Sequence, residues 1–434
     1  MHNPLRLFKS EFVRSIATLT SGNLLALIIT VSMTPIVTRI FSPSEFGLFA
    51  LFMAIVGICS QVGSLCYERA ILLPKDEVEA GVVFTLSLLV LFAFVLVVTS
   101  LIIFFGTDIA TILGNAELTD WAMLIPLGIL IVGITNVLRF WAIRQKKFRL
   151  ISSSRVIEAA VTGSLKILLG FLIGNWSGGL ILGTVLGSLV VLLVLLRYLK
   201  PDVSILRIRT NSAQNIREVA ESFRQFPIYA SWNALLTVSS RYLPVFFLSA
   251  FFGPAVVGFF NLASRMLTQP ISTISRSVST VYFQKSASQR AAEHQITSGL
   301  VKLTLALFAF GFVPFLLSAV FAVEIFSIVF GDQWEVAGYY AQIMTPWFFL
   351  LFIRAPANIV FEVCQRQELK LFITFGNSIL SIVAMSLLYF HDSKPAAVIG
   401  AFVTVNSFMS ILQILLAVKV ARESDRGSVS SLAG

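Results

Sequence analysis

The sequence predicts an all-α polytopic membrane protein with twelve transmembrane helices, arranged as two six-helix halves around a central cationic cavity. Hydrophobic residues fill 57% of the 434 positions and charged residues only 12%. In a soluble domain roughly a quarter of the residues are charged. Apolar stretches of the length needed to cross about 30 Å of hydrocarbon recur along the chain. Lysine and arginine gather in alternate connections between these stretches. Together these observations exclude a soluble fold.

The apolar stretches are each about 20 residues long or more and are separated by short polar breaks. The fifth contains Glu158 and Lys166, but without it the basic segments on its two sides would fall on opposite sides of the membrane. Prolines inside several stretches, Pro356 among them, should bend the helices. The twelve predicted spans are approximately 17–38, 46–67, 82–105, 121–143, 156–174, 178–199, 228–251, 255–279, 300–330, 338–361, 369–390 and 396–419.

The distribution of basic residues predicts the orientation. With the amino terminus in the cytoplasm, 25 of the 32 lysines and arginines lie in inside segments and only Arg39 and Lys394 lie outside. This asymmetry is typical of membrane proteins and predicts that both termini are cytoplasmic. The net charge of +10 then reflects topology and contact with anionic phospholipids, so no nucleic-acid partner is expected.

Two short motifs recur and predict that the two halves are related by a repeat. Residues 41–49 (FSPSEFGLF) resemble 252–260 (FGPAVVGFF) at an offset of 211, and 144–150 (RQKKFRL) resemble 365–371 (QRQELKL) at an offset of 221. Such repeats place the substrate site of many transporters between the halves. The predicted division is an amino-terminal half over 1–199, a cytoplasmic linker over 200–227 and a carboxy-terminal half over 228–434.

Charged and polar side chains within the spans mark the candidate site, because lipid penalises them unless they face protein or water. Arginine matches phosphate groups by paired hydrogen bonds and keeps its charge when desolvated. Arg265 and Arg241 have no acidic residue within two turns of their own helices, which favours an anion-binding role over internal pairing. The residues predicted to bind an anionic headgroup are Arg265, Arg241, Lys166, Arg354, Asn261 and Asn233.

The few acidic residues at the spans are candidates for ion coupling. Glu158, Glu362 and Glu68 all lie towards the predicted cytoplasmic side. The alternative is internal pairing, of Glu158 with Arg155 or Lys166 and of Glu362 with Arg366.

No constellation for catalysis, metal binding or a cofactor is evident. The three histidines lie in the terminus and the predicted loops without partners for a triad, and the three cysteines have no metal-type spacing. We therefore expect the protein not to be an enzyme and to need neither a metal nor a cofactor.

The chain resembles the Wzx-type flippases of the polysaccharide transport family, in the superfamily that also holds the multidrug and toxic compound extruders. The resemblance rests on residues 34–49 (TPIVTRIFSPSEFGLF), 67–75 (YERAILLPK) and 261–265 (NLASR) with Pro270. Arg265 and Glu68 are the positions carried over, although the family's common Arg-Tyr-Glu motif reads Cys66-Tyr67-Glu68 here.

The resemblance implies a flippase in the bacterial inner membrane that moves an undecaprenyl-diphosphate-linked oligosaccharide to the outer leaflet for O-antigen, lipopolysaccharide, capsule or exopolysaccharide assembly. A polysaccharide polymerase and a chain-length regulator are the implied protein partners. Two alternatives stay open. One is an ion-coupled multidrug or cation extruder of the same architecture, although the first span carries no acidic residue that would bind a coupling ion. The other is a membrane polysaccharide polymerase, although every predicted outer connection is short.

Overall fold

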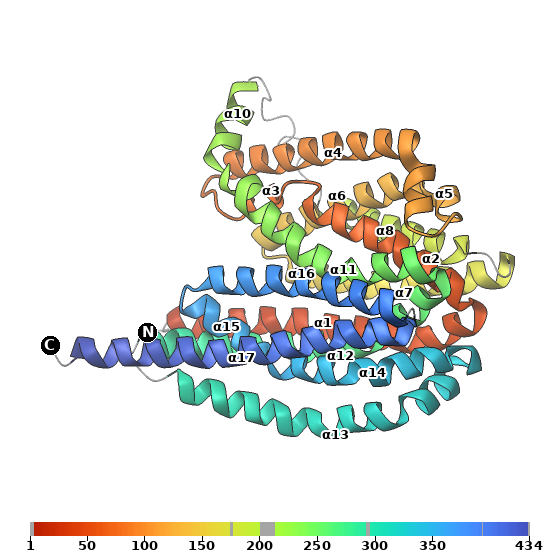
Figure 1. Cartoon of the computed structure of the whole chain (residues 1–434). Coiled ribbons are helices and arrows are strands. Elements are labelled where there is room, and N and C mark those ends of the chain that lie inside the picture. Colours follow the sequence, from red (N-terminus) through yellow and green to blue (C-terminus); the bar gives the residue numbers. More distant parts are fainter. Residues whose placement is uncertain (1–3, 174–176, 200–212, 292–295, 393, 433–434) are drawn as a thin grey trace. The chain divides into compact units, whose positions relative to one another are not determined.

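The computed structural model describes residues 4–173, 177–199, 213–291, 296–392 and 394–432, and every regular element in them is a helix (Figure 1). The elements of residues 4–252 are α1 (Pro4–Ile40), α2 (Pro43–Val62), α3 (Tyr67–Ala70), α4 (Glu77–Ile112), α5 (Leu118–Trp121), α6 (Leu124–Arg144), α7 (Phe148–Ile173), α8 (Gly178–Leu199), α10 (Ala213–Ser222), the π-helix η1 (Phe226–Ala230) and α11 (Ser231–Phe252). Those that follow are α12 (Pro254–Ala291), α13 (Thr297–Phe330), the 3-10 helix η2 (Asp332–Trp334), α14 (Glu335–Ile353), α15 (Ala355–Val363), α16 (Gln367–Asp392) and α17 (Pro395–Leu432).

Eleven stretches of helix in the described part of the chain are long and apolar enough to cross a membrane. They correspond to eleven of the twelve predicted spans, which confirms an all-α polytopic membrane protein. The predicted eighth span, 255–279, falls on α12, whose polar residues keep it out of that set. The count of twelve therefore stays a prediction.

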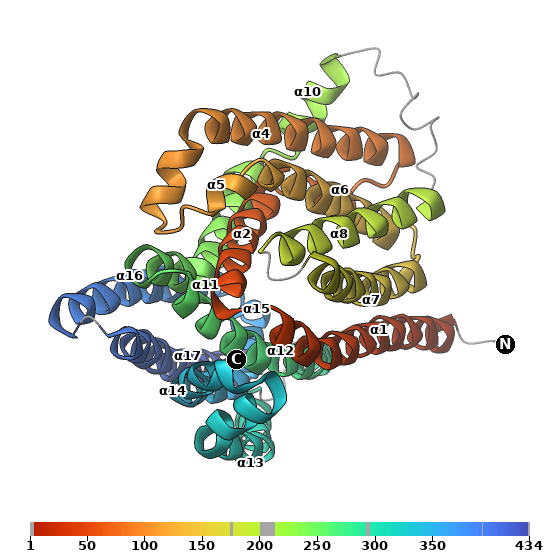
Figure 2. The ribbon, with the colours of Figure 1, turned by 90° about the vertical axis from the view of Figure 1, so that its right-hand side faces the viewer.

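The chain forms two compact units, Met1–Val257 and Gly258–Gly434. In the first unit α7 packs against both α1 and α8, α6 lies between α4 and α8, and α11 packs against α2 (Figure 2). In the second unit α14 packs against α13 and α17, and α16 packs against α17. The predicted division into halves at 199 and 228 stays a prediction.

The predicted tenth span, 338–361, is not one continuous helix. It breaks at Arg354, which ends α14 and caps α15. Pro356 follows two residues later and has no N–H group to continue the helical hydrogen bonds. The proline thus separates a long helix from a short one.

The structure supports the internal repeat and corrects part of its register. Pro43 and Pro254 each begin a helix, which agrees with the offset of 211. The turns after α6 and α15 instead correspond at an offset of 219 rather than 221. Lys146 and Gln365 have positive φ angles of 54° and 56° in these turns. The amide of the residue after each, Lys147 or Arg366, donates to the carbonyl five residues earlier, at 2.9 and 2.8 Å.

The two turns therefore have the same Schellman geometry. The alignment of residues 144–150 with 365–371 was displaced by two positions because it matched polar residue types. A turn is defined by its backbone conformation and tolerates many polar side chains.

Candidate functional site

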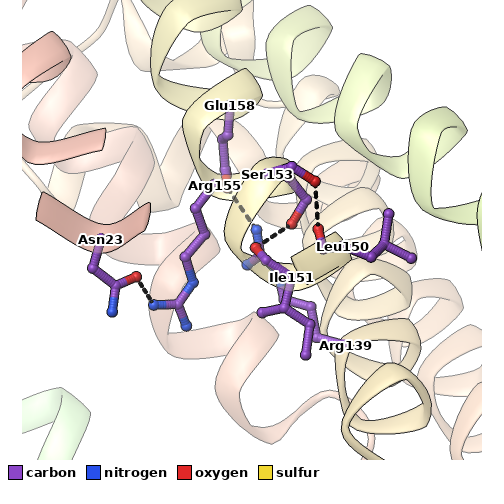
Figure 3. A network of polar contacts seen from close by, with 8 residues as sticks. Asn23, Arg139, Leu150, Ile151, Ser153, Arg155 and Glu158 are labelled. Atoms are coloured by element: carbon purple, nitrogen blue, oxygen red, sulfur yellow. Dashed lines mark hydrogen bonds and ion pairs between the residues drawn. The ribbon is translucent and has the colours of Figure 1, made fainter. Parts of the chain in front are cut away.

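Arg139 on α6 and Glu158 on α7 form an ion pair within the first unit (Figure 3). The Arg139 Nη2 atom lies 2.6 Å from Glu158 Oε2, and the two side chains are 21% and 38% exposed. The Nε atom of Arg139 is buried and has no acceptor among the described residues. Part of the guanidinium is therefore still able to donate.

Arg155 lies one turn before Glu158 on α7 and points towards α1, where it donates to the side-chain oxygen of Asn23 (Figure 3). On the preceding turn of α7, Ser152 donates to the carbonyl of Thr18 at 2.9 Å. These contacts fix α7 against α1 and place a second guanidinium one helical turn from Glu158.

The pairings predicted for Glu158 and Glu362 are wrong. Glu158 pairs with Arg139 instead of Arg155 or Lys166. Glu362 pairs with Lys370 at 3.2 Å instead of Arg366. Both expectations considered residues that are close in sequence, whereas the turn that follows α6 or α15 folds the next helix back and brings more distant residues together.

Lys166 is packed among α2, α7 and α8 of the first unit. It is 8% exposed, and its ammonium nitrogen lies 4.2 Å from the centre of the Phe49 ring. Gly183 on α8 lies so close that a methyl group there would be 2.9 Å from the Lys166 backbone nitrogen. A cation over an aromatic ring is stabilised by the ring quadrupole.

Asn233 and Arg241 lie on α11 in the same unit and are both exposed. The backbone carbonyl of Asn233 accepts a hydrogen bond from Thr237 at 2.8 Å. Arg241 makes no hydrogen bond or ion pair with another described residue.

In the second unit, Asn261 and Arg265 lie one turn apart on α12 and are half-buried. Arg265 has no hydrogen-bond or ion-pair partner among the described residues. Further along the helix, Gln269 Oε1 and Ser275 Oγ are buried and also lack partners among them. This helix therefore carries a cation and polar groups with unused hydrogen-bonding capacity.

Arg354, at the break between α14 and α15, contacts an amide network in the second unit. Its Nη1 atom donates to Gln413 Oε1 on α17 at 2.6 Å. The amide nitrogen of Gln413 donates in turn to Asn358 Oδ1 at 2.9 Å. Arg354 thus connects the helix break to α17.

Sequence reasoning missed the polar residues of the last two helices. Asn377 donates to Asn406 at 2.9 Å, and Asn406 donates to Ser381 at 3.2 Å. The signal was present, because Asn377 and Ser381 are four residues apart on α16 and Asn406 and Gln413 are two turns apart on α17.

Glu68 lies on the short helix α3, outside the apolar helices, and is 5% exposed. Ser64 donates to its Oε2 atom at 2.5 Å. Burial raises the pKa of the Glu68 carboxyl above its ordinary value, and the Ser64 hydrogen bond partly opposes this rise. Among the described residues, no group of three or more His, Cys, Asp or Glu side chains could hold a metal ion.

Comparison with known proteins supports a transporter fold. The model of a family described as "Polysaccharide biosynthesis protein" matches residues 36–338. A search of curated proteins gave no match. The solved structure of the lipid II flippase MurJ in an inward closed conformation is similar with a TM-score of 0.71 and 13% identity, covering 96% of this chain and 91% of that chain.

The inward-facing structure of a multidrug resistance MATE transporter of the MOP superfamily is similar with a TM-score of 0.70 and 15% identity, covering 93% of this chain and 96% of that chain. At these identities the likeness concerns the fold. The family and this fold agree with the prediction that the protein is not an enzyme. The match over most of the chain means that it belongs to the family of polysaccharide biosynthesis proteins.

Proposed function

We propose that this protein is a flippase that carries undecaprenyl-diphosphate-linked oligosaccharide repeat units from the cytoplasmic to the outer leaflet of the bacterial inner membrane. The observation that supports this most directly is Arg265, a half-buried guanidinium on the predicted eighth span without a partner among the described residues. A cation in hydrocarbon costs roughly 2.5–3.5 kcal/mol on insertion scales, so its presence calls for a compensating anion. A diphosphate is such an anion and accepts paired hydrogen bonds from arginine.

In this mechanism Arg265 and Arg241 hold the diphosphate, Asn261 and Asn233 donate to sugar hydroxyls, and the polyprenyl tail stays in the bilayer. Lys166 and Arg354 add positive potential from their packed positions. Alternating access between two six-helix halves moves the headgroup, and Glu158, Glu362 and Glu68 are the candidate groups for coupling to an ion gradient. The termini face the cytoplasm, and a polymerase and a chain-length regulator receive the product.

The test is complementation of a deletion strain. Arg265→Ala should abolish surface polysaccharide and cause the lipid-linked repeat unit to accumulate, at unchanged protein level. Arg265→Lys, which keeps the charge but loses the paired donors, should restore part of the activity. The matched control is Arg217→Ala, because Arg217 is 82% exposed and pairs only with Glu221 on its own helix among the described residues. Full complementation by Arg265→Ala would contradict the proposal.

An extruder of drugs or cations is the second candidate, because the multidrug transporter fold covers nearly the whole chain. Drug susceptibility of the same deletion strain distinguishes the two functions. If the protein is a flippase, the deletion strain should be as susceptible to cationic compounds as a second mutant of the same polysaccharide pathway that also lacks the surface polysaccharide.

A further inference from the structure

The internal repeat allows the ion pair of the first unit to be compared with its counterpart in the second. At the offset of 219 defined by the turns after α6 and α15, Arg139 corresponds to Asn358 and Glu158 to Asn377. Arg155 corresponds to Thr374. The counterparts of Arg139, Arg155 and Glu158 in the second unit are therefore all neutral.

The helices that carry Glu158 and Asn377 nevertheless pack on the next helix in both units, α7 on α8 and α16 on α17. In the first, Gly187 on α8 lies against Thr162 on α7, since a methyl group at Gly187 would be 2.2 Å from Thr162 Oγ1. In the second, the corresponding residues are Asn406 on α17 and Ser381 on α16, whose side chains are hydrogen-bonded at 3.2 Å. This arrangement of helices thus forms with or without an ion pair, so packing alone does not require Arg139 and Glu158 to be charged.

The local geometry suits a phosphate group. The Arg139 guanidinium donates through one nitrogen to Glu158, and its Nε atom is buried without an acceptor among the described residues. Arg155 lies one turn before Glu158 on α7 and supplies a second guanidinium, which donates to the side-chain oxygen of Asn23. Both side chains of the ion pair are partly exposed, so an anion from solution could reach them. A carboxylate and a phosphate present similar paired oxygen acceptors to arginine.

We propose that Arg139 and Arg155 form a binding site for a phosphate or diphosphate group, and that Glu158 occupies this site until the ligand displaces it. The inference rests on the proposed function in naming the diphosphate, but the site is separate in sequence from Arg265. The turn that follows α6 is basic and predicted to be cytoplasmic, and Arg139 lies five residues before the end of α6. The site would therefore be where the headgroup first binds. The phosphate could come from the lipid-linked substrate or from an anionic phospholipid.

Binding of inorganic pyrophosphate to the purified full-length protein in detergent tests the site. Glu158→Gln removes the competing carboxylate and should tighten pyrophosphate binding about tenfold. Arg139→Gln should abolish the binding that depends on this site. Glu77→Gln is the matched control, because it makes the same change in the Arg144–Glu77 ion pair of the same unit and should leave binding unchanged. Equal or weaker binding by Glu158→Gln would overturn the proposal.

A double variant separates a binding role from a structural one. Arg139→Asn with Glu158→Asn reproduces the neutral pair of the second unit, so it should melt within about 3 °C of the wild type while losing pyrophosphate binding. Retained binding by this folded variant would contradict the inference. Loss of folding would contradict it as well, because the pair would then be structural.

A binding measurement with a second ligand distinguishes the two sources of the phosphate. If the site serves a diphosphate, glycerol 3-phosphate should bind Glu158→Gln at least about tenfold more weakly than pyrophosphate. Equal binding would assign the site to the single phosphate of a phospholipid headgroup. Should the double variant also complement the deletion strain fully while Arg265→Ala does not, this inference fails and the proposed function stands.

Discussion

The close contact between α2 and the start of α12 makes Gly47 a sensitive position in the first unit. A methyl group at Gly47 would lie 1.7 Å from the carbonyl oxygen of Pro254, 2.5 Å from its carbonyl carbon and 2.9 Å from its Cα atom. All three atoms belong to the backbone, so no change of side-chain rotamer relieves the clash. Gly47→Ala should therefore force the two helices apart.

The size of the effect follows from the clearance. An ordinary van der Waals contact begins at 3.4 Å, so one backbone must move by about 1.7 Å from the other. Overpacking of this kind costs about 1–3 kcal/mol, and the better helix propensity of alanine offsets at most about 1 kcal/mol of that. With about 2–4 °C of melting temperature per kcal/mol in larger domains, we expect Gly47→Ala to melt several degrees below the wild type.

Thermal melting of the purified protein in detergent, followed by intrinsic fluorescence, measures this change. Gly400→Ala is the matched control, because a methyl group at this position of α17 has no atom within 4 Å and should leave the melting temperature equal or higher. If Gly47→Ala and Gly400→Ala melt together, α2 and the start of α12 are not in contact as described and the reasoning is refuted.

Three further predictions concern the loops and termini. Asp425→Ala should destabilise the protein by about 1–2 kcal/mol, because its carboxylate accepts from two backbone amides at the start of α13, at 2.8 and 3.1 Å; an unchanged melting temperature would contradict this. The raised pKa of Glu68 means that the folded state holds the proton more tightly, so its stabilising contribution is complete below pH 4.5 and is lost as pH rises through the raised pKa. Glu68→Gln should therefore be more stable than the wild type at neutral pH and lose less stability as the pH rises above 4.5, and an identical pH dependence of the two melting temperatures would disprove the shift. Arg144→Ala should speed proteolysis between α3 and α4, since the guanidinium donates to three carbonyls of that connection, whereas Arg217→Ala should not.

The charged residues show how far sequence patterns predict a site. Helical periodicity correctly grouped Asn261 with Arg265 and drew attention to Arg354, because residues three or four apart share a helix face. It could not name the helix that each face contacts. Glu158 thus pairs with Arg139 on another helix, and Arg354 contacts Gln413 on α17.

The sequence by itself determined that the chain spans a membrane repeatedly, where nearly every span lies and that two parts of it repeat. It could do so because hydrocarbon requires long apolar helices whatever their neighbours are. Only the tertiary structure decided the register of the repeat after α6 and α15, the break at Arg354 and the partners of the charged residues in the helices. These depend on how helices pack and where the backbone turns, and a pair such as Arg139 and Glu158 forms only after the turn between α6 and α7 has brought the two helices together.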